Sequence, residues 1–205
     1  MPAPQDADAP PRRGRPRSAK ARAAILTAAT ELLLDQGIAR MSMDAVAEQA
    51  GVSKATIYRW WPSKESLALD ALREWAVAGL EEHDTGSLRG DLLATVLPWV
   101  REVRRRPFGR AIAALIAEAR SDPHFAEAYR TVFVDRRRRP ARAAFERAIA
   151  RGEVGAGLDV ELALDLVYGP LYHRLLHGHA PLTEGFAGEV VDHVVAGIER
   201  LDRRP

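Results

Sequence analysis

The sequence contains no cysteine, which excludes disulfide bonds, a cysteine-ligated zinc site and a thiol nucleophile. Its apolar runs are also short, because none approaches the roughly 18 residues that a membrane-spanning helix requires. Residues 1–11 are rich in Pro, Ala and Asp and lack the apolar stretch of a secretory signal. From these absences we expect a soluble, cytoplasmic protein with no membrane partner.

Alternating β-branched residues are scarce as well, whereas Leu, Ala, Arg and Glu are abundant, so the sequence predicts an all-α fold. Capping residues, glycines and prolines divide the pattern into about nine helices. The expected helices span residues 18–36, 43–50, 53–60, 64–82, 88–104, 108–120, 124–151, 159–178 and 183–200. The first three form a small domain and the later ones a helical bundle.

The net charge of +2 is unevenly distributed along the chain. Residues 1–64 carry ten Lys or Arg against six Asp or Glu, whereas the remaining residues carry a slight acidic excess. Six basic residues and no acidic one lie between Arg12 and Arg22. This asymmetry predicts a polyanionic partner, such as nucleic acid, for the first part of the chain only.

Residues 42–61 have the pattern of a helix-turn-helix. Two short helical segments meet at Gly51, which permits the positive φ of a tight turn. Ala47 is small enough for the two helices to approach closely, and Val46 and Ile57 are spaced to be buried between them. In such a motif the second helix lies in the DNA major groove.

Residues 18–72 also resemble the N-terminal domain of the TetR/AcrR transcriptional regulators. The resemblance rests on residues 25–29, Leu32-Leu33, Gly37-Ile38, residues 42–47, residues 50–58 with the Gly-Val-Ser-x-x-Thr-Ile-Tyr core, and residues 61–67 with Ser-Lys-Glu. The chain departs from the family at Trp61, where many relatives have Phe, and at Pro62, where they have Lys or Gly. Both departures keep a large apolar residue followed by a break in the helix.

The resemblance implies a homodimer whose N-terminal helices bind double-stranded DNA at a palindromic operator and whose C-terminal bundle binds an unknown small molecule. It implies a repressor that the ligand releases. The expected domains are a disordered basic arm (1–17), a DNA-binding domain (18–64) and a ligand-binding and dimerisation domain (65–205). The expected DNA contacts are Ser42, Ser53, Lys54, Thr56, Tyr58, Arg59, Trp60 and Lys64.

The basic arm offers a second DNA contact through Arg13, Arg15 and Arg17. The Gly14-Arg15-Pro16 sequence is similar to the core of minor-groove AT-hook segments, whose extended cationic backbone enters a narrow A·T minor groove. The other reading, which is favoured because six residues are a weak motif, is a basic tail that only adds affinity through counterion release.

The C-terminal helices contain a candidate ligand pocket and a candidate dimer face, although each residue also fits ordinary core packing. The pocket candidates are Trp99, Phe108, Ile112, Leu115, Phe125, Tyr129, Phe133, Tyr168, Tyr172 and His173. The candidates for the dimer face are Leu162, Leu166, Leu175, Phe186, Val190, Val191, Val194, Val195 and Ile198.

Two further patterns indicate no site. His173 and His177 share a helix face with metal-ligand spacing, but no nearby cysteine or carboxylate completes a set, so we expect neither a metal nor another cofactor. The arginine runs at 104–106 and 136–139 are either solvated helix faces or a second anion-binding surface, and the solvated reading is favoured. No catalytic constellation is evident, which leaves an enzyme, or a DNA-organising protein without a ligand, as the alternatives.

Overall fold

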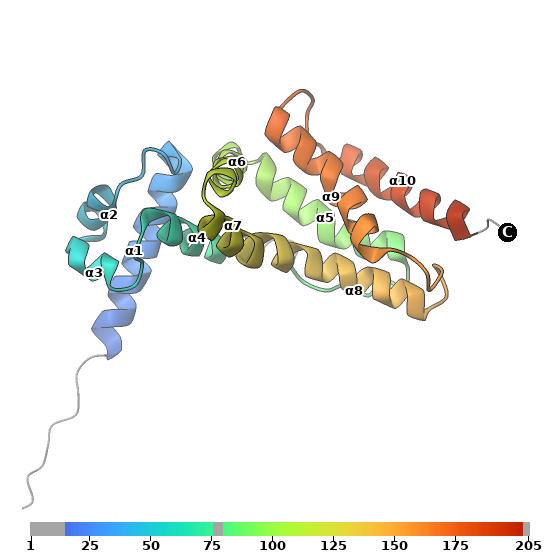
Figure 1. Cartoon of the computed structure of the whole chain (residues 1–205), viewed down its shortest axis with the longest axis horizontal. Coiled ribbons are helices and arrows are strands. Elements are labelled where there is room, and N and C mark those ends of the chain that lie inside the picture. Colours follow the sequence, from blue (N-terminus) through green and yellow to red (C-terminus); the bar gives the residue numbers. More distant parts are fainter. Residues whose placement is uncertain (1–14, 76–79, 203–205) are drawn as a thin grey trace, which may run out of the picture.

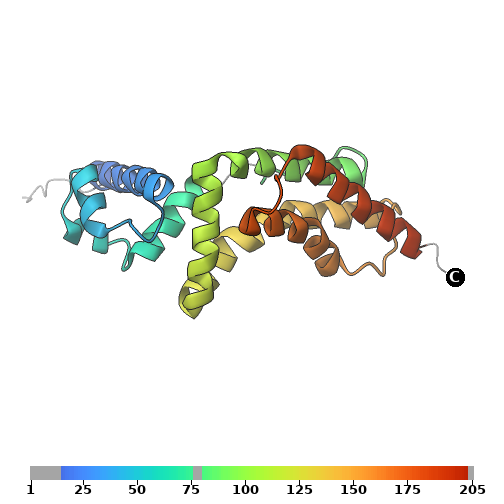
Figure 2. The same ribbon diagram turned by 90° about the horizontal axis from the view of Figure 1, so that it is seen from above.

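The computed structural model describes residues 15–75 and 80–202 of the chain. These residues form ten α-helices and one π-helix without any strand, which agrees with the predicted all-α fold. Helices α1–α4 gather at one end of an elongated molecule, and α5–α10 form the rest (Figure 1). Viewed from above, α6 runs across the long axis, whereas α5 and α10 run along it (Figure 2). None of the described helices is both long and apolar enough to cross a membrane.

The N-terminal domain closes around a core in which Ile25, Val46, Ile57 and Leu67 are fully buried. Each of its helices supplies one of these side chains, so no helix of the domain has a core of its own. Its helices are α1 (Arg15–Gln36), α2 (Met43–Ala50), α3 (Lys54–Tyr58) and α4 (Lys64–Trp75).

Three helices in this domain have bounds that differ from the sequence-based expectation. Helix α3, expected over residues 53–60, spans Lys54–Tyr58. Helix α1 begins at Arg15, so the predicted disordered arm of residues 1–17 overlaps its first turn, and residues 1–14 lie outside the described residues. Helix α4 is described to Trp75, whereas we expected it to reach residue 82. Leu80 to Glu82 are not helical, and the turn at Asp84–Ser87 follows them directly.

The C-terminal domain follows the predicted order of helices. Its central helix α5 (Leu88–Arg104) contacts α6, α8 and α10. The helix expected over 124–151 contains a π-helical stretch, so it is divided into α7, η1 and α8. The other elements are α6 (Arg106–Ser121), α7 (Pro123–Tyr129), η1 (Arg130–Asp135), α8 (Arg136–Ala150), α9 (Val160–His177) and α10 (Glu184–Asp202).

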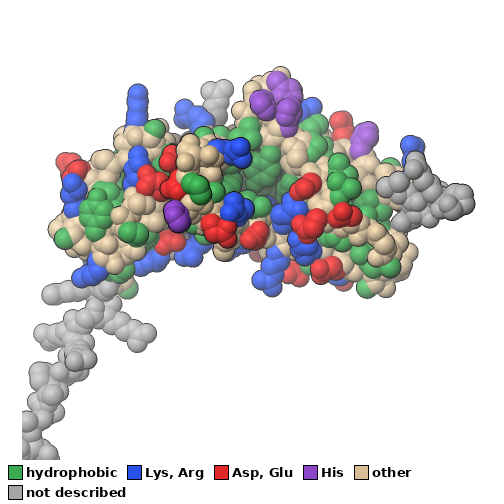
Figure 3. Space-filling view, viewed as in Figure 1, with side chains coloured by type: hydrophobic (Ala, Val, Ile, Leu, Met, Phe, Trp, Pro, Cys, Tyr) green, Lys and Arg blue, Asp and Glu red, His purple; other side chains and the backbone are tan. Residues whose placement is uncertain are grey.

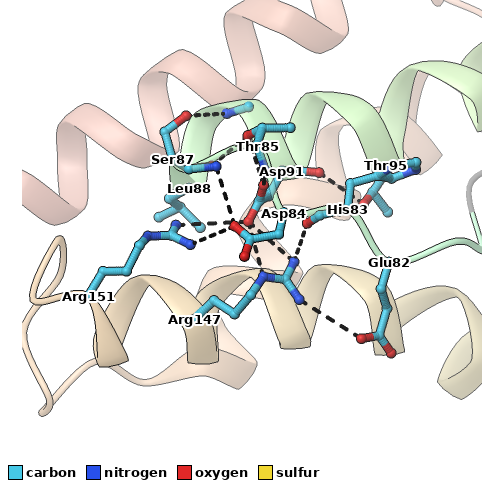
Figure 4. A network of polar contacts seen from close by, with 12 residues as sticks. Glu82, His83, Asp84, Thr85, Ser87, Leu88, Asp91, Thr95, Arg147 and Arg151 are labelled. Atoms are coloured by element: carbon cyan, nitrogen blue, oxygen red, sulfur yellow. Dashed lines mark hydrogen bonds and ion pairs between the residues drawn. The ribbon is translucent and has the colours of Figure 1, made fainter.

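A buried carboxylate fastens the start of this domain to α8. Asp91 on α5 has no exposed surface, and its Oδ1 accepts hydrogen bonds from the Thr85 backbone N–H (2.6 Å) and hydroxyl (2.8 Å). Its Oδ2 accepts from Arg147 of α8 at 3.2 Å, and Arg147 also donates to the carbonyl oxygen of His83. Figure 4 shows these groups converging between the 82–88 segment and α8. The carboxylate therefore holds the segment that enters α5.

We expect Asp91→Asn to lower the free energy of unfolding by about 3 kcal/mol at pH 7, because it leaves Arg147 without its buried anionic partner. Hydrogen bonds from Thr85 and Arg147 outweigh burial and lower the pKa of Asp91 below its ordinary value. The stabilisation is therefore complete above the unfolded pKa of about 4 and is lost as the pH falls through the lower folded pKa.

Urea denaturation between pH 7 and pH 3 measures this difference. The matched control is Asp192→Asn, which removes an exposed carboxylate that pairs with Arg89 at 2.7 Å. The control should change stability by less than about 1 kcal/mol. A difference between wild type and Asp91→Asn that stays constant down to pH 3 would contradict the assignment.

Candidate nucleic-acid interface and C-terminal pocket

The turn between α2 and α3 has the predicted helix-turn-helix geometry. The Ser42 hydroxyl caps α2 by accepting from the Ala45 N–H, and the Ser53 hydroxyl caps α3 by accepting from the Thr56 N–H. Gly51 has φ 65°, in the left-handed region that favours glycine, so its role in the turn is confirmed. The caps and the glycine together fix where α2 ends and where α3 begins.

Helix α3 lies at the outer end of the molecule (Figure 1). Tyr58 is 49% exposed, and Arg59 is also exposed with its guanidinium 4.8 Å from the centre of the Trp60 ring. Lys54 pairs with Asp44 of α2 at 2.7 Å, and this contact raises the pKa of Lys54. The surface therefore offers hydroxyl and cationic donors around one short helix, a chemistry suited to phosphates and base edges.

The remaining predicted DNA contacts are less available or lie elsewhere. Lys64 begins α4, and its Nζ donates to the backbone carbonyl of Ile38 at 3.2 Å, so part of its donor capacity stabilises the fold. The Ser53 and Thr56 hydroxyls contact each other at 2.9 Å. Arg13 lies outside the described residues, and Arg15 and Arg17 fall in the first turn of α1.

The Asp70 carboxylate on α4 contacts both α1 and the residues that follow the helix-turn-helix. Its Oδ2 accepts from the indole N–H of Trp61 at 2.9 Å and from Arg22 of α1 at 3.2 Å. The Arg22 guanidinium also lies 5.5 Å from the centre of the Trp61 ring. Asp70 therefore adds a polar contact between α4, α1 and the residue that follows α3, beside the shared apolar core.

The C-terminal domain contains an open pocket of about 380 Å³ between α6, α7, η1, α8 and α9. Of the ten residues predicted for a pocket, Tyr129, Tyr168 and Tyr172 line this one. Six others are buried core residues that are not among its lining residues: Trp99, Phe108, Ile112, Leu115, Phe125 and Phe133. Figure 3 shows a hollow with hydrophobic side chains near the middle of the face where α6, α8 and α9 meet.

His173 differs from the expectation because its side chain is exposed and does not line the pocket. Helix rotation explains the difference, since the preceding Tyr172 turns inward against Trp99, with ring centres 5.1 Å apart. The His173 ring lies instead near those of His177 and His179, at 4.6 and 4.8 Å. Among the described residues, neither these histidines nor any other group of three potential ligands is arranged to hold a metal ion.

Seven lining residues were not predicted from the sequence, and Arg137 is the buried cation among them. The run at 136–139 suggests a solvated face, but Arg137 is only 6% exposed, lines the pocket and lies 5.9 Å from the centre of the Trp99 ring. Burial lowers the pKa of its guanidinium. A run of four arginines on one helix necessarily covers every face of that helix, and this could have indicated that one of them points inward.

The predicted dimer face is partly an exposed apolar groove on α9 and α10. Leu162 and Leu166 are 56% and 51% exposed, and a groove of about 480 Å³ runs beside Leu166. It is lined by Leu166, Pro170, Phe186, Glu189, Val190, His193, Val194, Gly197 and Ile198. Val191, in contrast, is fully buried, because it lies on the inward side of α10, where that helix packs on α5. Leu175 and Val195 are half-buried and are not among the groove residues.

Two family models match the chain. Residues 25–71 match a model described as bacterial regulatory proteins, tetR family, and residues 82–194 match one described as tetracyclin repressor-like, C-terminal domain. The first match ends within α4, and the second begins before α5.

Individual proteins resemble the chain over almost its whole length. It is 38% identical over 193 residues to the DNA-binding transcriptional repressor TetR of Mycobacteroides abscessus, covering 94% of this chain and 98% of that one. The crystal structure of the TetR family transcription regulator SCO0332 superposes with a TM-score of 0.74 at 37% identity, covering 87% and 98%. The crystal structure of the transcriptional regulator FadR from Bacillus subtilis in complex with stearoyl-CoA has a similar fold, with a TM-score of 0.71 at 19% identity, covering 86% and 98%.

Replacement of Asp70 tests the connection between α4 and the helix-turn-helix. We expect Asp70→Asn to lower the free energy of unfolding by about 1–2 kcal/mol, because the charge-assisted bond from Arg22 is lost. Urea denaturation measures the change. The control is Asp35→Asn, the same substitution at an exposed site near the end of α1, which should be neutral. Equal changes in the free energy of unfolding for the two variants would show that the hydrogen bonds of Asp70 do not stabilise the domain.

Proposed function

Because this chain belongs to the TetR family of DNA-binding transcriptional regulators, we propose that it is a repressor released from a palindromic operator by a small molecule bound in the α6–α9 pocket. The observation that carries the proposal is the position of α4. This helix contacts α7 and η1, which line the pocket, and it holds Trp61 and α1 through Asp70. We propose no enzymatic activity for the chain.

The contacts to DNA come from α3 and its flanks. Tyr58 and Arg59 are exposed at the outer end of the molecule, where they reach base edges or phosphates of the major groove. The Lys54 ammonium pairs with Asp44 in the free protein. On binding DNA, it either leaves Asp44 for a phosphate or contacts both groups. The Ser42, Thr56 and Trp60 side chains surround this centre, and Arg13, Arg15 and Arg17 add counterion release from the arm.

A second copy of the chain covers the α9–α10 groove in this proposal. Leu162 and Leu166 are exposed beside an apolar groove, and contiguous exposed apolar surface is typical of a protein-protein contact. Pairing α9 and α10 with their counterparts gives an isologous four-helix interface. That interface sets the distance between the two α3 helices, and a palindrome with a fixed half-site spacing is the consequence.

Release follows from the same connections. A ligand between α6, η1 and α9 moves the elements that α4 contacts, and Asp70 transmits the movement to Trp61 and α3. The two α3 helices of the dimer then no longer match successive major grooves. FadR, whose fold is similar, was solved in complex with stearoyl-CoA, which supports a ligand-binding role for the domain.

Selection of bound sequences from a random duplex DNA library tests the DNA-binding part. We expect enrichment of an inverted repeat whose half-sites are about one helical turn, or a multiple of it, apart. Tyr58→Ala and Arg59→Ala should each weaken binding of the selected DNA by about tenfold or more in fluorescence anisotropy.

The matched control is Arg110→Ala, which removes the same charge from an exposed position on α6 and should leave the affinity unchanged. Enrichment of no sequence by the wild type would favour the alternative, a DNA-organising protein without an operator.

The dimer face is tested by Leu166→Glu, which places a charge in the middle of the groove. We expect this variant to be monomeric in sedimentation equilibrium and to lose operator binding, because an unpaired buried charge costs several kcal/mol at an interface. Ala117→Glu adds the same charge at an exposed position of α6 and should remain dimeric. A dimeric Leu166→Glu protein would place the interface elsewhere.

A further inference from the structure

The polar groups of the α6–α9 pocket are almost all hydrogen-bond donors. Tyr129, Arg137 and Tyr172 line it together, and each is close enough to influence the pKa of another. Among the described residues, nothing in the protein accepts a hydrogen bond from the Tyr129 or Tyr172 hydroxyl, whereas Tyr168 donates to the Arg137 carbonyl at 2.9 Å. Two phenol donors therefore face the pocket beside a buried cation.

These groups keep one protonation state at physiological pH. Burial raises the pKa of both Tyr129 and Tyr172, so their hydroxyls keep their protons and remain donors. A guanidinium stays charged in proteins and has five N–H donors, so Arg137 can bind both protein and ligand. Acceptor oxygens on a ligand therefore match the guanidinium and the two hydroxyl donors, and a ligand with negative charge also compensates the desolvation of Arg137.

The charges at the mouth of the pocket do not reverse this preference. Asp165 is the single acidic residue among the lining residues, and Arg138 engages its Oδ1 at 2.5 Å. Arg138 also pairs with Glu161 at 2.9 Å, and Glu161 contacts Arg142. The two carboxylates and the two guanidinium groups at the mouth thus balance in charge. The charge inside the pocket is therefore the positive charge of Arg137.

The rest of the lining is apolar, with Ile116, Val134 and Leu176 beside the tyrosine rings. The π-helical stretch η1 forms one wall, and such stretches occur frequently at functional sites. A volume of about 380 Å³ lies within the range of small-molecule pockets. The pocket is therefore suited to a compact ligand rather than to a polar polymer.

We propose that this pocket binds a small organic carboxylate with an apolar body, whose carboxylate oxygens accept hydrogen bonds from Arg137 and from the Tyr129 and Tyr172 hydroxyls. The inference deepens the proposed function, since it names the chemical class of the ligand, and it rests on that function only for the effect on DNA. The apolar body lies against Ile116, Val134 and the exposed edge of Gly169.

Matched pairs of probes test the proposal by calorimetry on the full-length chain. The pairs are 1-naphthoate, indole-3-acetate and octanoate, each with its primary amide, which has the same shape but no charge. We expect at least one acid to bind and its amide to bind at least tenfold more weakly. Arg137→Gln should abolish the preference for the acid, and Arg137→Lys, which keeps the cation, should retain it.

Gly169→Leu tests the place of binding without relying on Arg137. A Cβ built at Gly169 meets no atom within 4 Å, so the larger side chain fills the pocket without a clash at the backbone. It should prevent binding of both acid and amide. Gly185→Leu, at an exposed position of α10, is the matched control and should bind like the wild type. Thermal unfolding of every variant reports whether it is folded.

Failure of this inference can be distinguished from failure of the proposed function. Absence of binding by all three acids, equal binding of acids and amides, or undiminished binding by Gly169→Leu overturns the ligand class, even if the protein still binds its selected DNA. Acid binding with the expected response to the variants supports the site, even if DNA is not released. In that second case the release mechanism fails and the ligand class stands.

Discussion

The contacts between the N-terminal helices and the bundle determine whether the two halves of this molecule move together. Helix α1 contacts α6, and α4 contacts α7 and η1. Within the N-terminal domain, Asp70 of α4 accepts hydrogen bonds from Trp61, which follows α3, and from Arg22 of α1. A DNA-reading domain linked only by the chain between α4 and α5 would reorient independently of the bundle, and no event in the pocket could then influence it.

Local chemistry explains why the helix-turn-helix could be predicted so closely from the sequence. The residues that define it, Ser42, Gly51 and Ser53, act on backbone groups within three to five positions of themselves. Predicted bounds of 43–50 and 88–104 agree with α2 and α5 for the same reason. Where the deciding contact lies far along the chain, as between Arg22 and Asp70, the sequence shows two charged residues and no indication that they meet.

The residues that line the pocket also could not be predicted from local sequence patterns. Aromatic residues in the bundle suggest a ligand site, but whether a ring lines a cavity or fills the core depends on helix rotation and packing, which the pattern does not determine. Tyr172 and His173 are neighbours and point to different environments. Arg137 shows the reverse error, because three arginines of its run stay at the surface or mouth while the packing of α8 against α9 buries the fourth.

Helix α9 has different surroundings on its two sides. Gly169 borders the donor-lined pocket, and the next residue, Pro170, borders the groove that a second copy would cover. In the proposed dimer, a single layer of helix would separate a ligand from the neighbouring subunit. Where monomer and dimer differ in affinity for the ligand, occupancy and self-association are thermodynamically linked, so the apparent affinity would depend on protein concentration and the two equivalent pockets would communicate across the symmetry axis.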